Sequence, residues 1–160
     1  AIYSGHHESA GEVGYLLPGP SALGKRYDQF GALESIVSGT GVAKRARMMT
    51  GKAYSSIEVF EAARKGKEWA QKIVDETADQ LSVAIANIAT LLDPELIVLG
   101  GGVSNSADLL IPAILKRIEG TIQHIPRIEA SSLGPRATVM GAITLTVHTT
   151  KDYFVVRKLN

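Results

Sequence analysis

The chain has 160 residues, 45% hydrophobic and 21% charged, which are ordinary values for a water-soluble globular protein. This length predicts one domain, residues 1–160, with a tail from about residue 149. A net charge of +1 gives no sign of a nucleic-acid or membrane partner, and no apolar run is long enough to cross a bilayer. The absence of cysteine excludes disulfides, thiol catalysis and cysteine-ligated zinc, and it suits a cytoplasmic protein.

Little regular structure is predicted for the first part of the chain. Ala1–Gly5 has the pattern of a strand or the end of one. Ala10–Tyr15 is a glycine-bracketed segment with one carboxylate and one phenol. Two prolines and three glycines between Leu17 and Gly31 then predict an irregular loop. A loop of this length inside a domain is more often functional than idle.

Three short helical patterns follow. Leu33–Val37 predicts a single helical turn, and Thr40–Met49 predicts a helix. We interpret the basic cluster on and beside this helix as a solvated face; it comprises Lys44, Arg45, Arg47 and Lys52. Ser55–Glu58 is a capping box that begins another helix, which ends at Gly66.

The strongest helical pattern begins at Lys67 and is ended by Pro94. Its apolar stripe has spacings of three and four residues and comprises Trp69, Ile73, Thr77, Leu81, Ala84, Ile88 and Leu92. Trp69 is therefore expected in the core and not as a ligand platform. The part from Val83 to Leu92 is apolar almost all round, so we expect it deep in the core.

The functional interpretation depends on Leu96–Leu99 and the three glycines that follow. Four apolar residues bounded by proline and glycine predict a strand buried on both faces, as in a parallel sheet. Gly100–Gly102 allow a sharp turn and the close approach of a flat or anionic ligand to main-chain N–H groups. A nucleotide in an α/β sheet binds at such a strand–turn–helix junction. The alternative is a tight turn without a ligand.

Two common phosphate motifs do not fit this turn. A dinucleotide fingerprint would need glycine at Asn105, and a P-loop would need Gly-Lys-Ser/Thr where Val103–Asn105 stands. A turn that presents its main chain to an adenosine, with the phosphates held elsewhere, fits better.

The remaining elements complete an α/β order with a short sheet. We expect a helix from Ala107 to about Ile118, a strand at Arg127–Ala130 and a last helix from about Ala137 to His148. Glycine inside a helix costs about 1 kcal/mol relative to alanine, so something is expected to pack closely against Gly141. Tyr153–Asn160 is either a short strand or disordered.

Glu12 and Glu34 are the carboxylates that we expect to be functional, because each lies in or beside a glycine-rich loop. Such a carboxylate can accept two hydroxyl hydrogen bonds, as sugar binding requires. The alternative is a carboxylate that caps main-chain N–H groups. The adjacent His6 and His7 lack the spacing of a metal site, and no Ser-His-Asp arrangement or phosphate cradle is visible.

Together these motifs resemble the second half of a ROK-family protein. That family contains bacterial sugar kinases, including glucokinases, and sugar-responsive transcriptional repressors. The resemblance extends to about His148 and is carried by Ala10–Tyr15, Gly31–Glu34, Ser38–Thr40, Leu92–Val103 and Met140–Ala142. It implies an actin-like, ribonuclease-H-like ATPase fold of which this chain is the C-terminal half. The catalytic base and phosphate loops would then lie on an N-terminal lobe upstream.

The resemblance also implies residue roles. Glu12 and Glu34 match glutamates that contact sugar hydroxyls, and we expect Tyr15 to help them to orient the sugar. Gly100, Gly101, Gly102 and Val103 match the turn that lies against the adenosine of ATP. ATP with Mg²⁺ is the implied cofactor, a hexose or amino-sugar the implied substrate and a homodimer the implied assembly.

Two departures from the family pattern concern zinc. Tyr15 replaces the histidine of the Glu-x-Gly-His motif, and Gly24–Gly31 replaces the cysteine-rich zinc loop. Because all four zinc ligands are absent together, we expect no zinc. We expect packing of Tyr15, Tyr27 and Phe30 to hold the loop instead.

The intact glycine turn favours the interpretation that this chain is one half of an ATP-dependent kinase that phosphorylates a hexose. We expect this half to be inactive by itself. The alternative is the effector-binding and dimerisation domain of a sugar-responsive transcriptional repressor, with its DNA-binding module far upstream. A third reading gives the domain chiefly a role in dimerisation.

Overall fold

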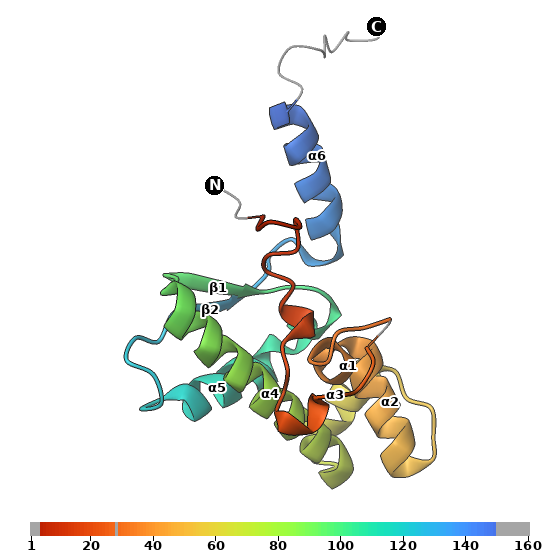
Figure 1. The fold of residues 1–160 in the computed structure, drawn as a ribbon. Coiled ribbons are helices and arrows are strands. Elements are labelled where there is room, and N and C mark those ends of the chain that lie inside the picture. The colour runs from red at the N-terminus through yellow and green to blue at the C-terminus, as the bar shows by residue number, and fades with distance from the viewer. Residues whose placement is uncertain (1–3, 28, 150–160) are drawn as a thin grey trace, which may run out of the picture.

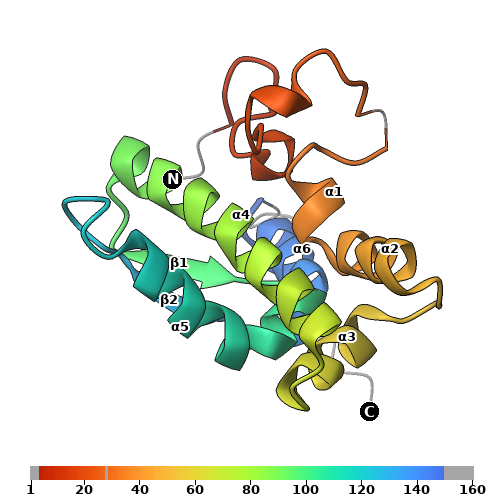
Figure 2. The ribbon, with the colours of Figure 1, turned by 90° about the horizontal axis from the view of Figure 1, so that it is seen from below.

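A two-stranded parallel sheet and two helices form one side of the structure (Figure 1). β1 (Leu96–Leu99) pairs with β2 (Arg127–Ala130), with Ile97 opposite Ile128. α5 (Ala107–Ile118) connects the two strands, and α4 (Glu68–Leu92) lies beside it on the same face of the sheet (Figure 2). This computed structural model describes residues 4–27 and 29–149. The predictions for Tyr153–Asn160 and for most of Ala1–Gly5 therefore lie outside the described residues.

Three short helices pack near the beginning of α4 (Figure 2). They are α1 (Glu34–Val37), α2 (Gly39–Thr50) and α3 (Ser56–Arg64). Before them the chain forms 3-10 turns at Val13–Tyr15 and Pro20–Ala22, within an otherwise irregular segment as predicted. After β2, a 3-10 turn at 134–136 leads into α6 (Ala137–Thr149), which projects away from the rest (Figure 1).

The core forms where α4 meets α3, α5 and the sheet. Its largest fully buried side chains come from α3, α4 and α5 and comprise Phe60, Ile73, Leu110, Ile114 and Ile118. Trp69 is half-buried against this core and stacks on Tyr54, with ring centroids 4.8 Å apart. The core role predicted for Trp69 is therefore confirmed.

Several local predictions are also confirmed. The bounds of α5 and β2 agree with the sequence patterns, and α4 ends at Leu92, two residues before Pro94. Ser55 Oγ accepts from the main-chain N–H of Glu58 at 3.2 Å, while a carboxylate oxygen of Glu58 accepts from the N–H of Ser55 at 2.7 Å. The bond from the Ser55 N–H, together with one from the Ser55 hydroxyl to the same carboxylate oxygen, lowers the pKa of Glu58. These hydrogen bonds explain why α3 begins where it does.

The prediction that β1 is buried on both faces is wrong for this structure. Ile97 and Leu99 are half-buried towards α4 and α5, whereas Leu96 is 37% and Val98 52% exposed. The reason is that helices cover only one face of the sheet within the described residues, and β1 has one strand neighbour there. An all-apolar strand with a bare face requires a further layer to bury it.

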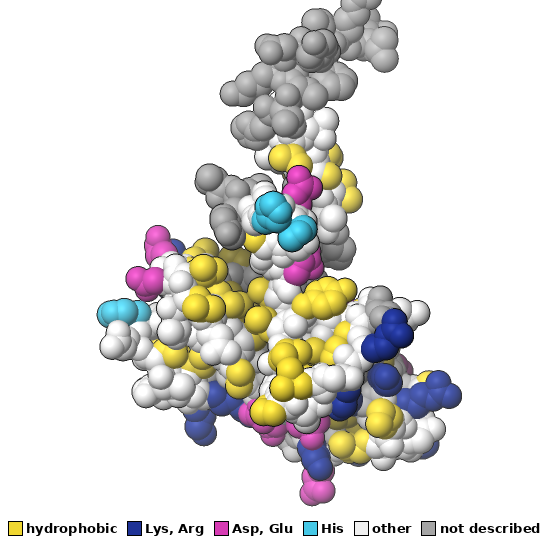
Figure 3. Space-filling model, viewed as in Figure 1, with side chains coloured by type: hydrophobic (Ala, Val, Ile, Leu, Met, Phe, Trp, Pro, Cys, Tyr) yellow, Lys and Arg dark blue, Asp and Glu magenta, His cyan; other side chains and the backbone are white. Residues whose placement is uncertain are grey.

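Two other burial predictions are wrong for the same reason. The end of α4 is not deep in the core, because Leu91 is 80% and Leu92 73% exposed. Nothing lies within 4 Å of the position that a Cβ on Gly141 would take. Apolar side chains on α6, including Val139 and Val147, are mainly exposed, and Figure 3 shows them along the projecting helix.

The segment before α1 is held in place by close contact between the main chains of Gly14 and Gly31. A Cβ on the buried Gly31 would lie 2.0 Å from the carbonyl oxygen of Gly14, so only glycine allows this approach. The expected packing of aromatic rings does not hold the segment, since Tyr15 is 55% and Phe30 44% exposed. Close main-chain approach takes the place of a side-chain cluster.

The prediction of a solvated basic face on α2 is wrong for one residue. Lys44, Arg47 and Lys52 are exposed, but the guanidinium of Arg45 lies between α1, α2 and α4.

As regards membranes, none of the helices in the described part of the chain has both the length and the apolarity needed to span one.

Gly31→Ala is expected to lower the free energy of unfolding by about 2 kcal/mol, because the new methyl group would displace Gly14. Gly19→Ala is the matched control, since Gly19 has extended φ of 161° and nothing within 4 Å of a Cβ. Urea unfolding followed by circular dichroism measures both. Equal stability of the two variants would contradict the glycine contact.

Candidate functional site

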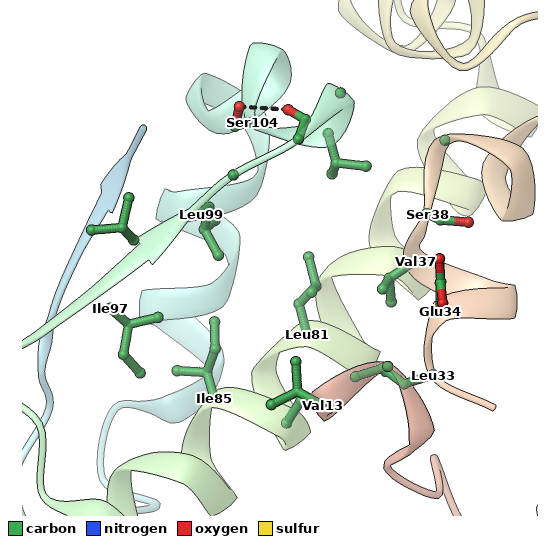
Figure 4. A pocket seen from close by; sticks show the side chains of 18 of the residues that line it. Val13, Leu33, Glu34, Val37, Ser38, Leu81, Ile85, Ile97, Leu99 and Ser104 are labelled. Carbon is green, nitrogen blue, oxygen red and sulfur yellow. Dashed lines mark hydrogen bonds between the residues drawn. The ribbon is translucent and has the colours of Figure 1, made fainter. Parts of the chain in front are cut away.

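A cavity of about 410 Å³ lies between α1, the middle of α4, β1 and the glycine turn (Figure 4). α4 and β1 supply apolar walls through Leu81, Ile85, Ile97 and Leu99, while Val13, Leu33 and Val37 close the opposite side. The lining carries few polar side chains: Glu34, Ser38 and Ser104. Cavities of this size and polarity typically bind small organic ligands.

The cavity brings together two features that lie far apart in the sequence. Glu34, in the first turn of α1, lines one wall, and Gly100–Val103 line the other. The predicted sugar-binding carboxylate and the predicted adenosine-binding turn therefore share one cavity. Neither periodicity nor spacing could have shown that they meet.

Glu34 has room to accept hydrogen bonds from a ligand. Its side chain lies against Gly14, where a Cβ would be only 3.3 Å from a Glu34 carboxylate oxygen. Among the described residues, no hydrogen bond or ion pair to this carboxylate is found. The alternative in which Glu34 caps main-chain N–H groups is thus not realised by the described part of the chain.

Hydrogen bonds from Ser104 fix the glycine turn, and the turn is open towards the cavity. Gly101 has a φ of +75°, in the left-handed region that favours glycine. Ser104 donates twice to the carbonyl oxygen of Gly101, from its main-chain N–H at 3.2 Å and its hydroxyl at 2.7 Å. Nothing lies within 4 Å of a Cβ on Gly100 or Gly102, so a ligand can approach the main chain.

Glu12 and Tyr15 are not part of the lining. Both side chains are exposed, whereas Val13 and Gly14 between them do line the cavity. The described structure thus brings Glu34 together with Gly100–Val103 and places Glu12 and Tyr15 beside this group without direct contact with the cavity.

Ser38 lines the cavity, although the sequence analysis named it only within the Ser38–Thr40 motif and gave it no binding role. It is the N-cap of α2, where its hydroxyl accepts from the N–H of Gly41 at 3.1 Å. Ser38 Oγ also lies 2.8 Å from Thr40 Oγ1. The cap signature Ser-x-x-Gly before α2 was visible in the sequence, but its position at the cavity was not.

The described lining of the cavity lacks the groups that phosphoryl transfer requires. Within the described lining there is one carboxylate and no lysine, arginine or histidine. No group of three His, Asp or Glu side chains that could share a metal ion is found among residues 4–27 and 29–149. Phosphoryl transfer needs a base, metal-holding carboxylates and a phosphate cradle. These groups must come from outside the described residues for such chemistry to occur here.

Strongly paired charges lie away from the cavity and are structural. Arg64 on α3 donates through Nε and Nη2 to both carboxylate oxygens of Asp108 on α5, at 3.0 and 2.7 Å. These bonds lower the pKa of Asp108. Arg117 on α5 similarly pairs with Asp75 and Asp79 on α4. Such exposed pairs set helix positions and contribute little stability individually.

Comparison with known proteins identifies the family. The ROK family profile matches residues 1–149. The chain belongs to the ROK family. The bifunctional enzyme NanE/NanK of Brucella melitensis is 37% identical over 139 residues, which are 85% of this chain and 25% of that enzyme. The N-acetyl-D-glucosamine kinase of Pectobacterium atrosepticum is 35% identical over 119 residues, covering 73% of this chain and 39% of the kinase.

Solved structures of ROK proteins share the fold. A ROK glucokinase from Streptomyces griseus, in complex with glucose and AMPPNP, has a TM-score of 0.76 and 24% identity, covering 91% of this chain and 54% of that one. A ROK transcriptional regulator described as a homologue of E. coli MLC has a TM-score of 0.65 and 23% identity, covering 81% and 36%. The predicted α/β, actin-like fold is confirmed. The chain spans only a quarter to about half of the proteins it matches.

Gly101→Ala is expected to destabilise the protein by about 1–2 kcal/mol, because alanine must adopt a left-handed conformation. Gly102→Ala is the control, since its φ is not positive and a Cβ there meets open space. Chemical unfolding without ligand separates the two. Equal loss of stability in both variants would show that φ at Gly101 does not determine the turn.

Proposed function

We propose that this chain is the sugar- and nucleotide-binding C-terminal half of an ATP-dependent sugar kinase. The observation that carries the proposal is the single cavity that unites the Glu34 carboxylate with the open glycine turn. An apolar cavity with an exposed main-chain turn suits a purine ring, and a free carboxylate suits the hydroxyl groups of a hexose or amino-sugar. The kinases among the ROK relatives support the same conclusion.

In this proposal Gly100–Val103 and the apolar wall of α4 and β1 hold the adenosine of ATP. Glu34 orients the sugar, with Glu12 and Tyr15 reaching it from the neighbouring segment. The γ-phosphoryl group passes from ATP to a sugar hydroxyl whose proton goes to a base, and ADP leaves. The described residues offer a single carboxylate at the cavity and no site for Mg²⁺. We therefore assign the base, the Mg²⁺ ligands and the phosphate cradle to an N-terminal lobe.

Two bare apolar surfaces support the presence of such a lobe in the complete protein. The exposed face of β1 and the exposed side chains of α6 leave large hydrophobic residues in water, among them Val98, Met140, Ile143 and Leu145. Contiguous exposed apolar surface marks a site where another protein layer packs. The match to only part of each relative fits this explanation. We retain a homodimer, a cytoplasmic location and the absence of zinc as further parts of the proposal.

The second candidate is the effector-binding domain of a sugar-responsive repressor. The similarity to a ROK transcriptional regulator favours it, since the same cavity could bind an effector sugar. The open glycine turn favours the kinase, because a sugar effector alone needs no adenosine site. Sugar-dependent DNA binding by the complete protein, without ATP-dependent phosphorylation, would establish the repressor.

Glu34→Gln in the complete protein is expected to raise the KM for the sugar about tenfold, because a charged hydrogen-bond acceptor is lost. The KM for ATP should change less than about twofold, since the glycine turn is untouched. Glu68→Gln, an exposed carboxylate at the start of α4, is the control and should leave both constants unchanged. A sugar KM that Glu34→Gln does not alter would contradict the assigned role.

The isolated chain of residues 1–160 is expected to have no sugar kinase activity, because its described residues provide neither base nor phosphate cradle. A coupled assay for ADP release, with glucose and N-acetylglucosamine as substrates, measures this against the complete protein. Phosphorylation by the isolated chain at the rate of the complete protein would refute the division of roles.

A further inference from the structure

Arg45 connects three helices through its guanidinium group. Nη1 donates to the carbonyl oxygen of Ile73 at 3.2 Å and to a carboxylate oxygen of Glu76 at 3.1 Å, both on α4. Nη2 donates to the carbonyl oxygen of Ile36 on α1, at 3.1 Å, and to the hydroxyl of Thr77 on α4. Only 18% of the side chain is exposed.

Burying a guanidinium here costs more free energy than burying an apolar side chain would. Burial lowers the pKa of Arg45, and its Nε is buried without a hydrogen-bond partner among the described residues. An apolar side chain could fill the same space without desolvating a charge. What only the guanidinium provides is a planar fork of donors in fixed directions, which here joins main-chain carbonyls of two helices.

α1 depends on such external support. It has four residues, too few for a helix to be stable alone, and the carbonyl groups of its last turn have no partners within the helix. Its beginning is fixed by the contact of Gly31 with Gly14, and its end lies against Gly41, where a Cβ would meet the carbonyl oxygen of Ser35 at 2.5 Å. Arg45 is the side chain that ties this end to α4.

The position of α1 determines the shape of the cavity. α1 carries Glu34 and Val37 on one side of the cavity, and α4 supplies Leu81 and Ile85 on another (Figure 4). A shift of α1 relative to α4 would therefore move Glu34 relative to the glycine turn.

We propose that Arg45 is a positioning residue that holds α1 against α4 and thereby fixes Glu34 at the sugar end of the cavity. The part that concerns the sugar rests on the proposed function, whereas the tether between α1 and α4 does not.

The tether is tested by hydrogen exchange in the complete protein with Arg45→Met, which keeps the length of the side chain and removes the fork. The reporters are the N–H groups of residues 35–38, which bond to carbonyls of residues 31, 33 and 34. We expect them to exchange about tenfold faster, while amides of α5 stay within about twofold. Arg45→Lys keeps the charge and removes the fork, so it should also speed the exchange of residues 35–38. This variant replaces Arg45→Met in the experiment if the methionine variant does not fold.

Arg64→Met is the matched control. Arg64 also joins two helices through a two-point contact with a carboxylate, but it links α3 to α5 and lies away from α1. Its removal should leave exchange of residues 35–38 unchanged. Equal protection of these amides in wild-type protein and both Arg45 variants would overturn the tether, whatever reaction the protein catalyses.

The link to the sugar is tested by kinetics at a temperature where the variants are folded. We expect Arg45→Met to raise the KM for the sugar about tenfold, with kcat and the KM for ATP within about threefold of wild type. Faster exchange with an unchanged sugar KM would overturn the positioning of Glu34 and keep the tether. Faster exchange in Arg45→Met than in wild type, combined with no kinase activity in the wild-type protein, would refute the proposed function and leave the tether standing.

Discussion

The packing of one face of α4 is the constraint on which the rest of the structure depends. This helix of 25 residues buries Ile73, Val74 and Ala78 against its neighbours, and its buried side chains are removed from water at a gain of about 25 cal/mol per Å² of apolar surface. α3 and α5 pack on it, and α1 and α2 are placed by it. Because α4 also supplies a wall of the cavity, the core and the candidate site share one support.

The site itself combines rigid and open parts. Ser104 fixes the glycine turn from behind, and the glycine contact before α1 fixes the segment that carries Glu34. At the contact of Gly31 with Gly14 main chain lies close to main chain, whereas at Gly100 and Gly102 the main chain faces open space. Such preorganisation lowers the entropy lost on binding. The guanidinium of Arg45 extends the same principle to the helix that bears the carboxylate.

The incompleteness of the sheet and the nature of the cavity have a common explanation. β1 is wholly apolar but has one bare face, whereas β2 alternates with charged residues such as Arg127 and Glu129 that suit solvent. Among the described residues, the cavity lining carries one carboxylate and no lysine, arginine or histidine. Each observation is what one part of a two-part kinase would show, and together with the family membership they make the proposed division of roles the simplest one.

Local chemistry let the sequence determine most elements of this protein. Capping by Ser55, termination by Pro94 and the period of the α4 stripe act within a few residues, so α3, α4, α5 and β2 could be predicted with their bounds. The ROK motifs likewise lie in the sequence itself, and the family that they indicated is confirmed. Burial at β1, Leu92 and Gly141 could not be predicted, because it depends on whether another layer covers them. Only the tertiary structure placed Glu34 opposite the glycine turn and buried Arg45 between helices, since both depend on contacts across tens of residues that no local pattern records.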